Sequence, residues 1–157
     1  MFEILHEETF EAEAQEVKRI IEERTPKNGW GIKSLEGKTL NVMLCGKETS
    51  KALNMSQRGL DKPTDVLSWA YTDCVEVDGE DDGLAGELAV CIPICIKQAS
   101  ENGWDFEIEF ARLLVHGLAH ILGYDHETAD EEEKMMRFEV AFLEKMGIAG
   151  LYSLSEP

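Results

Sequence analysis

Three of the four histidines in the chain lie within eleven residues of one another, at a spacing that suits the ligands of one metal ion. His116 and His120 are four residues apart, so both imidazoles project from the same face of a helix. Gly123 then permits a sharp turn that brings His126 back toward them. Three imidazoles without a thiolate are typical of a catalytic Zn²⁺ site with a fourth position left to water, and Ni²⁺ or Co²⁺ accept the same ligands. We therefore predict one metal ion per chain, with His116, His120 and His126 as its ligands.

The residue after the first of these histidines argues against proteolysis. Zinc proteases with this spacing carry Glu there as general base, whereas this chain carries Gly117. A bound metal would still lower the pKa of a water molecule to about 7 and stabilise charge on a carbonyl or phosphoryl oxygen. Glu109, one helical repeat before His116, has two interpretations: a base or partner of a metal ligand, or an ordinary acid paired with Arg112.

The segment from about Asp105 to Leu122 must form the helix that carries the first two histidines. At about 100° per residue, its polar side chains fall in one sector of about 80°, with Glu107 as the exception. These side chains are Asp105, Glu109, Arg112, His116 and His120. Apolar residues cover most of the remaining circumference, which is typical of a helix buried at the centre of a fold.

Shorter apolar patterns predict the elements around this helix. Strands are expected at Phe2–Leu5, Lys38–Cys45, Val66–Tyr71 and Leu84–Ile92. Further helices are expected at Glu8–Arg24, Lys47–Gln57 and about Ala129–Met146. Strands separated by helices, followed by helices alone, predict layers of helices over a small mixed sheet. No repeat or linker divides the 157 residues, so we expect a single domain over residues 1–157.

The charge of the chain is strongly acidic and unevenly distributed. Thirty-two acids and fifteen bases give a net charge of −17. Residues 1–63 hold ten bases and eleven acids, whereas residues 64–157 hold five bases and twenty-one acids. A nucleic-acid partner, which usually meets a basic surface, would have to approach the first part. The acidic runs Asp78–Gly83 and Asp130–Lys134 are interpreted as a solvated loop and the start of an exposed helix.

Cysteines and hydropathy indicate a reducing compartment and no membrane span. Cys45, Cys74, Cys91 and Cys95 form no C-x-x-C pair, and we expect buried free thiols. The longest uncharged apolar run, Leu88–Ile96, is far shorter than the roughly 20 residues that span a bilayer. The N-terminus is acidic and lacks the apolar segment of a secretory signal, so we expect a cytoplasmic protein.

Two separate stretches of the sequence resemble one known family. HGLAHILGYDH at His116–His126 is similar to the signature of the YbeY family of bacterial ribosomal-RNA maturation factors. LNMSQRGLDKPTDVLSWAY at Leu53–Tyr71 looks like that family's second motif, and the acidic segment up to Gly147 matches its final helix. Departures are Ala119 for Leu, Trp69 for Phe, and Glu87 where the family more often has Asp. None of them touches the histidines.

The resemblance implies a fold, an activity and a set of site residues. The implied fold is α+β, with a four-stranded mixed sheet and about five or six helices. The implied activity is a zinc-dependent, single-strand-specific endoribonuclease, used in 3′-end maturation of small-subunit ribosomal RNA and in ribosome quality control. Arg58 matches the family's functional arginine, and a guanidinium suits bidentate binding of a phosphodiester. Ser68 is a further candidate phosphate contact, whereas turn bonding explains Thr64 and Asp65 at least as well as catalysis does.

Other functions stay open at this point. One is a non-catalytic ribosome-assembly factor in which zinc is structural and holds the turn at Gly123. A protease of unusual mechanism is disfavoured by Gly117. The expected partners are single-stranded RNA and the small ribosomal subunit or its assembly proteins, with neither DNA nor a membrane.

Overall fold

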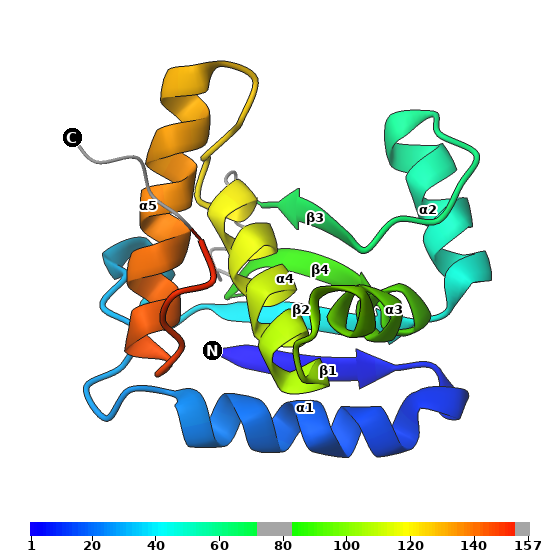
Figure 1. Cartoon of the computed structure of the whole chain (residues 1–157), viewed down its shortest axis with the longest axis horizontal. Coiled ribbons are helices and arrows are strands. Elements are labelled where there is room, and N and C mark those ends of the chain that lie inside the picture. The colour runs from blue at the N-terminus through cyan, green and yellow to red at the C-terminus, as the bar shows by residue number, and fades with distance from the viewer. Residues whose placement is uncertain (72–82, 153–157) are drawn as a thin grey trace, which may run out of the picture.

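Four strands form one mixed sheet in the computed structural model, which describes residues 1–71 and 83–152 (Figure 1). They are β1 (Phe2–His6), β2 (Thr39–Cys45), β3 (Val66–Ala70) and β4 (Leu84–Cys91). Their order across the sheet is β1-β2-β4-β3. The first three in that order run parallel, and β3 lies antiparallel to β4 at one edge. The acidic segment at residues 78–82 and Cys74 lie outside the described residues.

Five α-helices accompany the sheet in the described part of the chain. They are α1 (Glu11–Arg24), α2 (Lys47–Arg58), α3 (Ile92–Asn102), α4 (Phe106–Ile121) and α5 (Ala129–Lys145). Short 3₁₀ turns lie at Glu8–Phe10 and Lys33–Leu35. The predicted α+β fold, with a four-stranded mixed sheet and five or six helices, is confirmed. No helix among these is long and apolar enough to span a membrane.

Helix α3 is an element that sequence patterning does not predict. The predicted strand, Leu84–Ile92, is confirmed to within one residue, but the sequence pattern assigns the apolar residues after it to no element, and α3 starts at Ile92. Pro93 lies in the first turn of α3. Proline is tolerated there because the first backbone N–H groups of a helix have no partner within it. Gly103, at φ +69°, then ends the helix.

The two faces of the sheet are covered very differently. One face packs against α1, α3, α4 and α5 and forms the main core, with Leu40, Val42, Leu88 and Val90 pointing into it. The opposite face carries a small cluster of Cys45, Leu67 and Ala89, against which Leu53 of α2 packs. Figure 1 shows α4 crossing in front of the sheet, between the strands and α5. Helix α4 is therefore the central, nearly all-buried helix that its apolar pattern predicts.

Three cysteines of the described residues are free and buried, as the sequence predicts. Cys45, Cys91 and Cys95 are fully buried free thiols. Burial raises the pKa of Cys45 and Cys95 to about 12, because an apolar environment disfavours the thiolate. These side chains therefore act as small apolar residues of the core and not as nucleophiles.

Two glycines allow α4 and β3 to approach β4 closely. A Cβ atom on Gly117 of α4 would lie 2.5 Å from Cδ2 of Leu88. A Cβ atom on Gly86 of β4 would lie 2.6 Å from the backbone oxygen of Trp69 and 2.9 Å from Cδ1 of Ile121. The position of α4 on the sheet therefore depends on the absence of these two side chains.

We expect Gly86→Ala to lower the free energy of unfolding by about 2–3 kcal/mol, because a backbone atom of β3 must move to admit the methyl group. Gly46→Ala is the control, since its added Cβ meets only the Phe10 ring at an ordinary 3.6 Å. That variant should lose about 0.5 kcal/mol, the cost of alanine at a helix N-cap. Urea denaturation measures both values. Equal losses would contradict the close packing of β3 on β4.

Candidate metal centre and phosphate cleft

The three predicted ligands come together at the C-terminal end of α4. His116 and His120 project from successive turns of the helix, and their ring centroids are 4.8 Å apart. The ring centroid of His126 lies 5.3 Å from that of His120 and 6.0 Å from that of His116. One ligand atom from each ring lies within 4.8 Å of the other two. The three imidazoles thus face a common point.

The turn after α4 brings the third histidine back. Leu122 ends the helix, and Gly123 follows at φ +96°, a backbone conformation that side chains with a Cβ rarely adopt. The backbone N–H of Tyr124 donates to the Ala119 oxygen at 3.0 Å, which closes the turn over the end of the helix. Stacking of Tyr124 on Phe138 of α5 anchors it further, with centroids 4.8 Å apart.

A buried carboxylate on α5 orients the first ligand. Nδ1 of His116 lies 2.6 Å from Oε1 of Glu139, whose side chain is only 8% exposed. With Nδ1–H donating to this carboxylate, Nε2 is left as the nitrogen available to a metal. Carboxylate–histidine pairs of this kind fix the ring and raise the basicity of the ligand. Glu139 is therefore a positioning residue.

Sequence reasoning missed Glu139, although a signal was present. Residue 139 lies on the apolar side of α5, four residues after the buried Met135 and three before the buried Phe142. An acid among core positions of a helix requires a partner, because an unpaired buried charge is costly. That rule identifies Glu139 as functional or paired, but it does not identify His116 as the partner.

The local environment keeps the second ligand neutral. The pKa of His120 lies below its ordinary value of 6.5, first because burial disfavours the charged ring and then because His116 and His126 add positive charge when protonated. A neutral imidazole is the form that binds a metal. The donor set, three rings without a thiolate, fits Zn²⁺ with a position left for a further ligand.

The structure distinguishes between the two interpretations of Glu109. Its carboxylate is fully buried and accepts from Arg112, with Nη2 to Oε1 at 2.5 Å. Gln98 of α3 also donates to Oε1, at 2.9 Å. Burial alone would lower the pKa of Arg112, but the hydrogen bonds and charge of Glu109 outweigh it and raise that pKa further. Glu109 is thus the paired acid, and it does not line the space in front of the histidines.

A cleft of about 490 Å³ opens in front of the three histidines, and we call it the metal-site cleft. Its walls come from the end of α2, the following loop, β3, α4 and the turn after α4. Besides the histidines, it is lined by Gln57, Arg58, Thr64, Asp65, Ser68, Asp125 and Glu127, among others. The structure therefore brings the predicted Arg58 and Ser68 into the same cleft as the three histidines.

Arg58 is exposed at the C-terminal end of α2, where Gly59 at φ +71° ends the helix. Within the described part of the chain, no carboxylate pairs with its guanidinium. The loop after it is held by buried side chains of the same helix: Asn54 donates to the Lys62 oxygen at 2.7 Å and Ser50 donates to the Thr64 oxygen at 2.9 Å. Asn54 therefore positions the loop, while Arg58 faces the cleft.

Asp65 is engaged in bonds within the protein. Its Oδ1 accepts from the backbone N–H of Val66 at 2.7 Å, and its Oδ2 accepts from Gln98 at 3.3 Å. Both carboxylate oxygens of Asp65 thus take part in bonds that hold the turn before β3, which agrees with the structural explanation given for this residue from the sequence. Ser68 lies on β3, and its backbone oxygen accepts from Gln57 at 2.8 Å.

The packing of α4 also explains why a protease-type glutamate is absent from position 117. A side chain there would have to start 2.5 Å from Cδ2 of the buried Leu88. Position 117 thus lies at a close contact between α4 and β4, and a side-chain base fits there only if the buried Leu88 side chain or the helix moves.

These features define a class of protein: an α+β metalloprotein of one mixed sheet, with a three-histidine centre at the end of a buried helix and an arginine across the cleft. The chain matches the family model described as Endoribonuclease YbeY over residues 3–147. It is 36% identical over 125 residues to an Endoribonuclease YbeY of Aromatoleum aromaticum, covering 79% of this chain and 77% of that protein. It is 45% identical over 107 residues to one of Acinetobacter baumannii, covering 67% and 68%.

A solution structure of a protein from Thermotoga maritima has a similar fold. Its TM-score is 0.58 at 29% sequence identity, with 93% of this chain and 89% of that chain covered. The chain belongs to the Endoribonuclease YbeY family.

We expect Glu139→Ala to weaken metal binding by about 10- to 100-fold, because the ring of His116 loses the partner that fixes it. Glu139→Gln should retain part of the affinity, since its amide oxygen still accepts from Nδ1–H. Glu133→Gln on the exposed side of α5 is the control, since that carboxylate pairs with Arg137 at the surface. Competition with a chelating zinc indicator measures the affinities. Unchanged affinity in Glu139→Ala would show that the carboxylate does not support the ligand.

Proposed function

We propose that the protein is a zinc-dependent endoribonuclease that cleaves single-stranded RNA. The observation that carries the proposal is the shared cleft: a metal-binding group on α4 and an exposed arginine on α2 line the same hollow. An ion and a guanidinium that face one space suit a phosphodiester, because both compensate negative charge on its oxygens. The relatives named as endoribonucleases support the same reaction class.

The bound ion would be held by His116, His120 and His126, and it would act as a Lewis acid toward a phosphoryl oxygen. Arg58 binds the other oxygens of the same phosphate with its planar fork, and this contact strengthens as charge grows in the transition state. Ser68 offers a hydroxyl donor from the strand that forms the wall of the cleft. Glu139 holds the ring of His116 so that the ligand does not rotate during turnover.

The RNA itself follows from the family and from the distribution of charge. We propose small-subunit ribosomal RNA near its 3′ end as the substrate, in the bacterial cytoplasm, with the small subunit or its assembly proteins as partners. The acids concentrate in residues 64–157, whereas Arg58 belongs to the nearly neutral first part. A net charge of −17 repels free RNA at low salt. A partner that presents the strand removes that cost.

Arg58→Ala should lower kcat for cleavage of a single-stranded RNA by about 10²–10³-fold, the loss typical of a removed transition-state donor. Arg58→Lys should recover part of the rate, because lysine retains the charge without the bidentate fork. Arg137→Ala removes the same charge from the surface of α5 and should cleave at the parental rate. Equal rates in the parent, Arg58→Ala and His116→Ala would identify a contaminating nuclease and refute the proposal.

Metal analysis separates this function from that of an assembly factor with structural zinc. We expect about one Zn²⁺ per chain in the purified protein and its loss in each of His116→Ala, His120→Ala and His126→Ala. His6→Ala is the control, since His6 on β1 lies outside the cleft. A protein that holds zinc, melts at a lower temperature once the metal is removed and never cleaves RNA would favour the structural role.

A further inference from the structure

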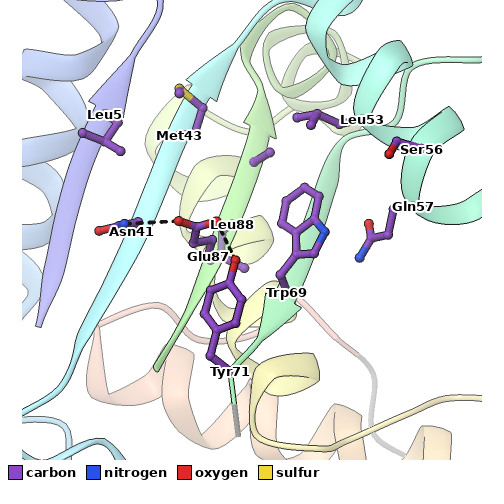
Figure 2. A pocket seen from close by; sticks show the side chains of 11 residues that line it. Leu5, Asn41, Met43, Leu53, Ser56, Gln57, Trp69, Tyr71, Glu87 and Leu88 are labelled. Carbon is purple, nitrogen blue, oxygen red and sulfur yellow. Dashed lines mark hydrogen bonds between the residues drawn. The ribbon is translucent and has the colours of Figure 1, made fainter. Parts of the chain in front are cut away.

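A second hollow, of about 430 Å³, lies on the face of the sheet that the main core leaves uncovered (Figure 2). We call it the open-face pocket. Its lining includes Asn41, Met43, Gln57, Trp69, Tyr71 and Glu87. In Figure 2 the indole of Trp69 stands on β3 and the ring of Tyr71 directly follows that strand, while Asn41 and Glu87 come from β2 and β4. The sheet therefore forms the floor of the open-face pocket, and α2 forms one of its sides.

This pocket and the metal-site cleft share a wall. Side chains alternate between the two faces of a strand, and Ser68 of β3 lines the cleft while Trp69 lines the pocket. Strand β3 lies at the edge of the sheet. Gln57 lines both hollows, and its amide donates to the Ser68 backbone oxygen at 2.8 Å. The edge strand β3 is therefore all that separates the metal-site cleft from the open-face pocket, and an RNA strand that occupies both would pass around it.

The polar groups of the pocket exclude a phosphate and suit a nucleobase. Glu87 is the charged group in it, and among the described residues no lysine or arginine lines it. Tyr71 donates to Oε2 of Glu87 at 2.9 Å, and Asn41 donates to Oε1 at 3.4 Å (Figure 2). These bonds hold the carboxylate in place as an acceptor for N–H groups. A phosphate would be repelled, whereas a base offers amino or ring N–H donors and an aromatic face.

Two of the departures from the family's sequence pattern meet in this pocket. Trp69, where phenylalanine is usual, lies directly opposite Glu87 in the antiparallel pairing of β3 and β4. Indole offers a larger stacking surface than phenyl, and glutamate reaches further than aspartate. The pair therefore places a stacking face beside a hydrogen-bond acceptor.

We infer that the open-face pocket binds one unpaired nucleobase of the RNA strand whose phosphate lies in the metal-site cleft, with the base stacked on Trp69. The inference rests on the proposed function, because it takes the occupant of the cleft to be RNA. It gives single-strand preference a physical basis: a base in a duplex is stacked and paired, and it must be extruded before it enters a pocket. Trp69 is thus a binding residue remote from the reacting phosphate.

The test measures binding separately from cleavage. Anisotropy of a labelled single-stranded RNA octamer is recorded with metal-loaded protein on ice, and a gel verifies that the RNA is intact. Trp69→Leu should bind it roughly 5- to 100-fold more weakly, the range for one lost base–aromatic stack. Trp69→Phe should retain most of the affinity. Trp104→Leu, which removes an indole that lines neither hollow, should bind like the parent.

A second measurement uses free nucleotides and needs no cleavage. Cytidine, uridine, adenosine and guanosine 5′-monophosphates should quench a part of the tryptophan fluorescence that is missing in Trp69→Leu. Ribose 5-phosphate, which lacks the base, should not. Circular dichroism melting shows that both leucine variants are folded.

The outcomes separate this inference from the proposed function. If the parent cleaves RNA while Trp69→Leu binds the octamer equally well and no nucleotide quenches Trp69, the pocket does not bind a base, and a peptide segment becomes its candidate occupant. If Trp69 reports base binding while the metal-loaded parent cleaves no RNA, the inference stands and the nuclease function fails.

Discussion

A helix buried on almost every side can carry polar side chains only where each has a partner, and α4 meets this condition along one stripe. Glu109 is fully buried and bound by Arg112 and Gln98. His116 is bound by Glu139, and His120 faces the other two imidazoles. The stripe therefore begins as an ion pair inside the protein and ends at the cleft in histidines that could hold a metal ion. An unpaired charge at either position would cost several kcal/mol, so the polar partners and the helix position are interdependent.

The partners of this stripe come from the elements that form the cleft. Gln98 of α3 donates both to Glu109 and to Asp65, at the start of β3. Glu139 comes from α5, which is anchored by the aromatic contacts of Phe138 with Tyr124 and of Phe142 with Trp30. The ion pair of α4 thus connects to the strand carrying Ser68, and the metal ligand connects to the last helix. This arrangement holds the side chains that line the cleft through residues that do not themselves line it, which is how a binding geometry is kept to within about 0.5 Å.

The sequence predicted those features of the fold and the site that depend on residues close together in the chain. The spacing of His116, His120 and Gly123 placed the metal centre, and the apolar circumference of α4 placed its helix at the centre of the fold, because helical periodicity alone sets both. The order of the strands in the sheet was not predicted from the sequence. Helix α3 was not predicted, because the run from Leu88 to Ile96 is uniformly apolar and carries no period, so strand and buried helix look alike. The contact between His116 and Glu139 was not predicted either, since it joins two helices whose relative position only tertiary packing decides.

The remaining question is how a chain with a net charge of −17 holds a polyanion. Net charge governs the long-range field, which salt screens within about 10 Å at 0.1 M, whereas binding depends on the few groups in contact. On the proposals made above, Arg58 and a metal ion held by the three histidines would provide positive charge beside the phosphate, and Trp69 would provide an uncharged stacking surface for a base. Side chains along β3 alternate between the two faces of the sheet, so Ser68 lines the metal-site cleft and Trp69 lines the open-face pocket. On this proposal the acidic surface would disfavour duplex RNA, whose bases are already stacked and paired and cannot enter the open-face pocket to offset the repulsion.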